Sequence, residues 1–161
     1  MTVFMRENDV FSFAFSQYTD TVYRIALNNT HCDADAQDIT QEVFLKLLES
    51  SKFFRDSAHL KAWLIRVTIN LCHDDYRQKS RSAAVQGEIK DEAVFDGNPV
   101  LEAVNALPEN YRNTIYLHYY EGYTAKEIAK ILGTKENTVL SWLSRARQKL
   151  KEEMIGGFDN E

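Results

Sequence analysis

Glycine, proline and cysteine are scarce in this chain of 161 residues, which has 6, 2 and 2 of them respectively. So few turn-forming residues argue against an all-β fold, which needs many tight turns. No apolar run approaches the roughly 20 residues that span a bilayer. The N-terminus carries acidic residues where a secretory signal would have its apolar segment. We therefore expect a helical protein in the cytoplasm.

The two cysteines, Cys32 and Cys72, form no Cys-x-x-Cys pair. His31 adjoins the first and His73 the second, so a metal site built from both halves is one alternative. Free thiols in a reducing compartment are the simpler interpretation, because neither half has ligand spacing of its own, and a redox role stays open. The chain also lacks a glycine-rich phosphate loop and a nucleophile–histidine signature. We expect no metal, no cofactor and no enzyme activity.

Charge is distributed unevenly, although the net charge is only -5. Residues 33–49 are mostly acidic among their charged positions, whereas residues 126–151 are mostly basic. A second basic cluster contains Arg77, Lys79 and Arg81. One acidic helix and two basic surfaces predict two kinds of partner.

Residues 123–150 have the pattern of a helix-turn-helix. The apolar stripes of the two expected helices are Ile128, Ile131 and Leu132, then Val139, Leu143, Ala146 and Leu150. Gly133 permits a left-handed turn between them, and Thr134 is placed to cap the second helix. In such a motif the second helix enters the DNA major groove. The spacing alone leaves an ordinary helical hairpin open as the alternative.

Apolar periodicity predicts further helices at about residues 10–27, 33–50, 58–78, 100–106 and 109–120. The buried face of the second is expected to contain Ile39, Val43, Leu47 and Leu48, with Phe44 beside them. Residues 79–98 lack this periodicity and have the composition of a flexible linker. The expected fold class is therefore all-α. A helical bundle at 1–78 and a smaller helix-turn-helix domain at 99–161 would be joined by the linker 79–98.

Three segments resemble the two-domain, extracytoplasmic-function class of bacterial RNA polymerase sigma factors. They are DAQDITQEVFLKL (35–47), AWLIRVTIN with the following DDYR (62–77), and LPENYR with the following EGYTAKEIA (107–129). The resemblance implies a dissociable subunit that binds core RNA polymerase, directs it to promoters through −10 and −35 elements, and assists DNA melting. It implies no small-molecule substrate. It also implies regulation by an anti-sigma factor, which can hold the protein at the membrane.

The resemblance assigns candidate residues to three surfaces. The acidic helix is expected to dock on the polymerase through Asp38, Gln41, Glu42 and Leu45. The downstream (−10) element is expected to contact Phe53, Phe54, Arg55, Lys61, Arg66, Asn70 and Arg77. The two phenylalanines would stack on a flipped base or form the walls of its pocket. The upstream (−35) element is expected to meet Lys135, Glu136, Asn137, Thr138 and Ser141 at base edges, and Arg145 and Arg147 at phosphates.

Two residues depart from the family pattern: Leu140 and Trp142 stand where many members have basic side chains. The upstream contact is therefore expected to be altered or less electrostatic. The main alternative is a stand-alone helix-turn-helix repressor or activator, which would bind duplex DNA without polymerase. The acidic helix and the aromatic loop argue against it, because a repressor needs neither. A helical adaptor that binds no DNA is a third interpretation, disfavoured by the basic second helix.

Overall fold

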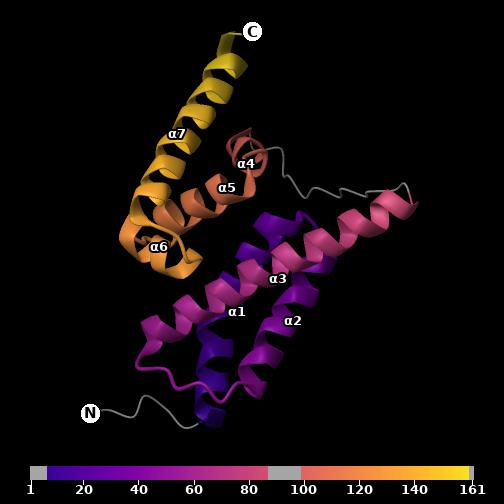
Figure 1. The fold of residues 1–161 in the computed structure, drawn as a ribbon, viewed down its shortest axis with the longest axis vertical. Helices are drawn as coiled ribbons and strands as arrows, with labels where there is room; N and C mark the ends of the chain where they lie inside the picture. The colour runs from indigo at the N-terminus through magenta and orange to yellow at the C-terminus, as the bar shows by residue number, and fades with distance from the viewer. Residues whose placement is uncertain (1–6, 87–98, 160–161) are drawn as a thin grey trace. The chain divides into compact units, whose positions relative to one another are not determined.

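The computed structural model describes residues 7–86 and 99–159, and every regular element in these ranges is a helix (Figure 1). The chain divides into two compact units, Met1–Val94 and Phe95–Glu161. The expected all-α class with two helical domains is thereby confirmed.

The first unit is a bundle of three helices that pack against one another: α1 (Glu7–Thr30), α2 (Asp33–Glu49) and α3 (Ser57–Gln86). Its core is built from aliphatic side chains spaced three or four residues apart on each helix, among them Val22, Ala26, Ile39, Val43, Leu60 and Leu64. Each large aliphatic side chain contributes roughly 1.5–3 kcal/mol when fully buried. The expected periodicity therefore describes the interior of this unit.

Leu48 is an exception to the predicted buried face of α2. Ile39, Val43 and Leu47 are buried, but the Leu48 side chain is 56% exposed. Successive residues on an α-helix are about 100° apart, so Leu47 and Leu48 do not share the centre of one face. Phe44, expected beside this face, is buried at its edge. The expected burial of Leu48 is wrong, and this leucine belongs to the solvent side of α2.

Helix α3 is longer than the sequence predicts. We expected it to end near Gln78, but it continues to Gln86, and Figure 1 draws it as one uninterrupted coil. The first eight residues of the expected linker, 79–86, are therefore helical. They contain neither proline nor glycine, so nothing in them stops a helix that is already formed. The rest of the expected linker, 87–98, lies outside the described residues.

Lys79 ties this extension to the rest of the bundle. Its ammonium group pairs with Asp35 at the start of α2, and with Asp75 one turn earlier on α3 at 3.5 Å. Burial by itself would lower the pKa of Lys79. The hydrogen bonds to the two aspartates and their negative charges outweigh burial, so the pKa is raised.

Replacing Lys79 with glutamine should destabilise the first unit by at most about 1 kcal/mol at pH 7, because the lysine side chain is 52% exposed. The raised pKa means that the pairing contributes fully below the ordinary lysine value of 10.5 and is lost as pH rises through the raised pKa. Denaturant unfolding of both proteins at a series of pH values from 7 upward would follow the cost of the substitution through this titration. Lys46→Gln, at an exposed position on α2, is the control. A cost for Lys79→Gln that is unchanged at high pH would contradict the charge pairing.

The second unit contains α4 (Pro99–Asn105), α5 (Glu109–Ile115), the π-helical segment η1 (Tyr116–Tyr120), α6 (Ala125–Leu132) and α7 (Glu136–Asp159). α7 packs against α4, α5 and α6. The buried guanidinium of Arg112 donates hydrogen bonds to the backbone carbonyls of Asn105 and Leu107, at 3.3 and 3.1 Å. Arg112 therefore fixes the end of α4 to α5, and α7 packs against these two helices.

Candidate nucleic-acid and polymerase interfaces

Helix α6 begins with a reciprocal pair of hydrogen bonds. The Thr124 hydroxyl accepts from the Glu127 amide at 3.2 Å, and the Glu127 carboxylate accepts from the Thr124 amide at 3.1 Å. Such a capping box satisfies two amides that the first turn of a helix leaves unpaired. The capping box was not among our sequence-based predictions, although Thr-x-x-Glu before an apolar stripe is its known signal. The capping box therefore fixes the start of α6, the first helix of the helix-turn-helix, directly after Thr124.

The turn between α6 and α7 has the geometry that Gly133 was expected to permit. Gly133 is left-handed, at φ 68° and ψ 37°, and the Ala129 carbonyl accepts from the amides of Gly133 and Thr134. Thr134 therefore belongs to the turn. The carbonyl of Lys135 accepts the first bond of α7, from Val139 at 3.2 Å. Lys135 and not Thr134 precedes the helix, so the expected capping role of Thr134 is wrong.

The first turns of α7 separate a buried stripe from an exposed face. Val139, Leu143 and Ala146 are at most 2% exposed, as the spacing predicted. Most candidate residues for base contact lie on the exposed face or just before it: Lys135, Glu136, Asn137 and Ser141. Thr138 is partly buried at its edge. The structure therefore brings together four of the five side chains that we expected at base edges.

The two arginines expected at phosphates differ in their surroundings. Arg145 is exposed. The guanidinium of Arg147 donates a hydrogen bond to the Tyr119 hydroxyl, and its central carbon lies 5.5 Å from the centre of that ring. A cation over an aromatic face stabilises a contact by roughly 0.5–1 kcal/mol at an exposed site. Arg147, which is exposed as well, thus links α7 to η1.

The candidate polymerase contacts form one continuous exposed surface on α2. Asp38, Gln41 and Glu42 are exposed, and Leu45 is 56% exposed. Leu48, which our prediction placed in the core, adds a second exposed leucine three residues after Leu45. We call these five residues the α2 surface. Counting 100° steps along the helix from Leu45 would have found Leu48 from the sequence.

The two adjacent phenylalanines in the loop before α3 point to different environments. Phe53 is 58% exposed, whereas Phe54 is 5% exposed and belongs to the core of the first unit. Phe54 packs edge-to-face against Trp63 and His59, with ring centres 5.5 and 5.4 Å away. Only Phe53 is available for stacking on a base in this conformation, while Phe54 anchors the loop.

His59 braces the same loop, and sequence reasoning did not single it out. The Asp56 carboxylate caps α3 by accepting from the His59 amide at 2.8 Å. The imidazole Nδ1 in turn accepts a hydrogen bond from the backbone amide of Arg55 at 3.2 Å. These bonds fix the backbone between the exposed side chains of Phe53 and Arg55.

His59→Ala should loosen this loop without unfolding the domain. Alanine removes the acceptor for the Arg55 amide, and a net hydrogen bond is worth about 1 kcal/mol, so amide exchange at Arg55 should accelerate about five-fold. His59→Asn, whose side-chain oxygen can accept the same bond, should restore most of the protection. Hydrogen exchange followed by NMR measures both. Equal protection in wild type and His59→Ala would contradict the bracing role.

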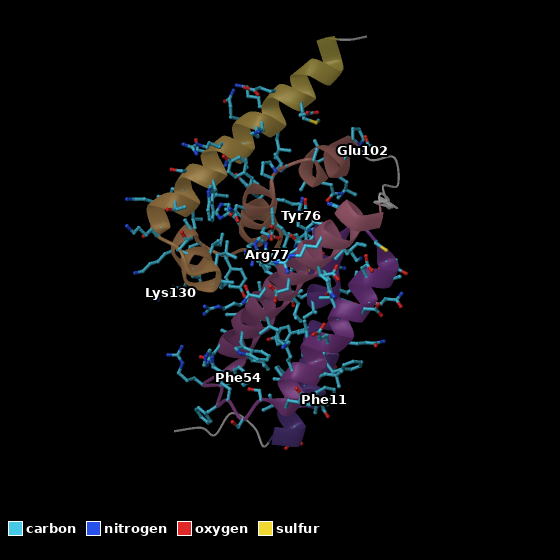
Figure 2. All side chains as sticks on the ribbon, turned by 45° about the vertical axis from the view of Figure 1, so that its right-hand side comes forward. Phe11, Phe54, Tyr76, Arg77, Glu102 and Lys130 are labelled. Atoms are coloured by element: carbon cyan, nitrogen blue, oxygen red, sulfur yellow. The ribbon has the colours of Figure 1, made fainter. Side chains whose placement is uncertain are left out.

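The remaining downstream candidates lie on α3. Arg66, Asn70 and Arg77 are exposed and, at spacings of four and seven, share one side of the helix. Lys61 is partly buried and lies about 140° around the helix from Arg66, so it does not join them. Tyr76, next to Arg77, is 68% exposed and was not among our candidate DNA-binding residues (Figure 2). An aromatic next to cations is the signal that could have found it.

Cys32 is partly buried and Cys72 buried, and both are free thiols. Within residues 7–86 and 99–159, no cluster of His, Cys, Asp and Glu has the makings of a metal site. Over the same ranges, no helix combines the length and the apolar character of a membrane span.

Two family models match the chain, one on each helical unit. Residues 14–82 match Sigma-70 region 2, and residues 98–150 match Sigma-70, region 4. Together these matches cover most of the chain. The chain belongs to the sigma-70 family, in its ECF class of RNA polymerase sigma factors.

Several curated relatives are similar over most of this chain. It is 31% identical over 157 residues to "Probable RNA polymerase sigma factor RfaY" of Xanthomonas campestris pv. campestris, covering 87% of this chain and 39% of that protein. It is 31% identical over 150 residues to "ECF RNA polymerase sigma factor SigE" of Mycolicibacterium smegmatis, covering 84% of this chain and 58% of that protein. The chain thus spans about two fifths to three fifths of the length of these two relatives. SigW of Bacillus subtilis is 26% identical over 172 residues, covering 92% and 90%.

Two solved structures share the fold. One is the sigma factor RpoE in complex with the anti-sigma factor NepR from Bartonella quintana, with a TM-score of 0.77 and 23% identity over 89% of this chain and 96% of that chain. The other is CnrH in complex with the cytosolic domain of CnrY, with a TM-score of 0.64 and 21% identity over 91% and 88%. At these identities the likeness shows the fold alone.

Proposed function

We propose that this protein is a sigma factor. It binds core RNA polymerase, directs it to promoters that carry −10 and −35 elements, and assists opening of the duplex without covalent chemistry of its own. The observation that carries the proposal is the presence, in one chain and in this order, of the two sigma-70 regions, each on its own helical unit. A stand-alone repressor or activator would need only the second.

The α2 surface is the proposed contact with core polymerase. Leu45 and Leu48 expose more than half of their side chains, and Asp38 and Glu42 lie on the same side of the helix. Large exposed apolar side chains among charged ones are typical of a protein interface. The carboxylates would steer a basic partner and fix its register, while the leucines would contribute buried area.

The −10 element is the proposed ligand of the loop before α3 and of α3 itself. Phe53 is exposed for stacking on an extruded base, on a backbone that His59 and Phe54 hold in place. Stacking of a base on an aromatic side chain contributes roughly 1–3 kcal/mol. Arg66, Asn70 and Arg77 would contact the displaced strand and its phosphates. The assignment covers duplex opening as well as binding, because a base must leave the stack before Phe53 can reach it.

The −35 element is the proposed ligand of α7. The turn at Gly133 and the capping box of α6 set the helix-turn-helix. Its second helix presents Glu136, Asn137 and Ser141, and Lys135 stands directly before it. Asn137 has the donor and acceptor that pair bidentately with adenine. Arg145 would contact a phosphate and add to the salt dependence of binding.

We also propose that an anti-sigma factor regulates this protein in the cytoplasm and can hold it at the membrane. Two structures with the same fold support this proposal: RpoE in complex with the anti-sigma factor NepR, and CnrH in complex with the cytosolic domain of CnrY. An inhibitor that covers the α2 surface would compete with polymerase for the same leucines. We propose neither a cofactor nor a small-molecule substrate.

The experiment that tests the proposal is co-elution of the full chain with purified bacterial core RNA polymerase on size exclusion. We expect a stable complex and, in its presence, specific retention of promoter fragments. A chain that does not join the polymerase but shifts duplex DNA by itself would overturn the sigma assignment in favour of a stand-alone regulator.

A further inference from the structure

Leu140 is an exposed leucine on the face of α7 that the candidate base contacts occupy. Its side chain is 48% exposed, whereas Val139 before it and Leu143 after it are at most 2% exposed. The packing of α7 on the rest of the unit is therefore supplied by its neighbours. An exposed leucine at this position contributes little to the core, and it leaves apolar surface in contact with water.

The surroundings of Leu140 make it a protruding side chain. One turn before it on the helix surface are Glu136 and Asn137, and one turn after it is Ser144. Ser141 follows it directly. The two serines are short, so the leucine extends beyond them. It also lies within the first two turns of α7, the part of a recognition helix that meets base edges.

The chemistry of leucine restricts what it can read there. Its side chain has neither a donor nor an acceptor, so it contacts neither phosphates nor purine edges by hydrogen bonds. The apolar group exposed in the major groove of DNA is the C5-methyl of thymine. We propose that Leu140 is a specificity residue that recognises one thymine methyl group in the upstream promoter element. This inference rests on the proposed function, because it requires α7 in the major groove.

The expected size of the effect follows from the group that is buried. Removing one methyl from a dry apolar contact changes a dissociation constant by about three- to five-fold. Deoxyuridine differs from thymidine only in lacking this methyl. A series of upstream elements in which thymines are replaced by deoxyuridine one at a time therefore isolates the proposed contact.

The experiment uses the full chain with core polymerase and measures its affinity for each promoter probe. For the wild type, one thymine-to-uracil replacement should weaken binding about three- to five-fold. Leu140→Ala should bind the thymine probe correspondingly more weakly and should no longer distinguish thymine from uracil at that position. Leu140→Met, which keeps an apolar side chain of similar length, should retain most of the discrimination. Leu101→Ala, at an exposed leucine on α4 of the same unit, is the matched control and should discriminate as the wild type does.

The outcomes separate this inference from the proposed function. Promoter binding without any sensitivity to a thymine methyl would overturn the role of Leu140 and leave the sigma assignment intact. Unchanged discrimination by Leu140→Ala would overturn it as well. A wild-type complex that shows no preference for the upstream element would overturn both.

Discussion

Replacing Asp38 and Glu42 together with arginine should weaken binding to core RNA polymerase by at least about 100-fold. Both carboxylates are exposed on the α2 surface beside Leu45 and Leu48, so the substitutions do not disturb the core of the bundle. Each reversal turns an attraction to a basic partner into repulsion between like charges, which costs several kcal/mol at an interface. A loss of 100-fold corresponds to about 2.7 kcal/mol. Titration of labelled protein with core polymerase measures the affinity.

The matched control is Asp9→Arg together with Asp20→Arg. These two aspartates are exposed on α1, and their reversal changes the net charge by the same amount. The control should bind polymerase within about two-fold of the wild type at physiological salt, since neither aspartate belongs to the α2 surface and salt screens exposed charges. Equal losses in both double variants would show an effect of net charge alone and would argue against the α2 surface as the docking site.

Ile128→Ala should unfold the helix-turn-helix unit while the first unit stays folded. Ile128 is 0% exposed in α6, a helix that packs against α7. Truncating a buried isoleucine costs about 2–5 kcal/mol, and a core this small rarely supplies more than about 3–5 kcal/mol. We therefore expect recognition of the −35 element to disappear, and binding of polymerase through α2 to persist.

Thermal unfolding and NMR spectra of the full chain measure this loss of structure. The spectrum should lose the dispersed signals of residues in the second unit and keep those of the first. Ile128→Val removes a single methylene, should cost about 0.5–1.5 kcal/mol and should leave the unit folded. An alanine variant that melts like the wild type would contradict the packing described for α6 and α7.

The sequence predicted the helices well because their apolar residues repeat with the helical period. Where that period is the only determinant, as for Val139, Leu143 and Ala146, the buried face was correct. The prediction was wrong for the burial of Leu48 and short by two turns at the end of α3. For Leu48 the prediction did not follow the helical period strictly, because Leu48 lies about 100° around the helix from Leu47. The end of α3 has no local stop signal in the part of the chain that the structure describes, and the pairing of Lys79 with Asp35 is a contact between distant residues.

The candidate sites were predicted less completely, because their details depend on tertiary contacts. Phe53 and Phe54 are chemically identical neighbours, and only the path of the loop decides which one enters the core. The contact of Arg147 with Tyr119 joins residues that are 28 positions apart, so periodicity does not reveal it. The exposed residues of the α2 surface required only the geometry of a single helix. The roles of all these residues in binding stay predictions until they are measured.

The most direct test of the sigma assignment is transcription by core polymerase on supercoiled genomic fragments, with and without this protein. Our account predicts discrete new transcripts whose start sites share one pair of −10 and −35 elements, and whose synthesis stops when either element is scrambled. Unchanged transcription in the presence of the chain, together with a sequence-specific shift of duplex DNA by the chain alone, would contradict it and identify a stand-alone regulator.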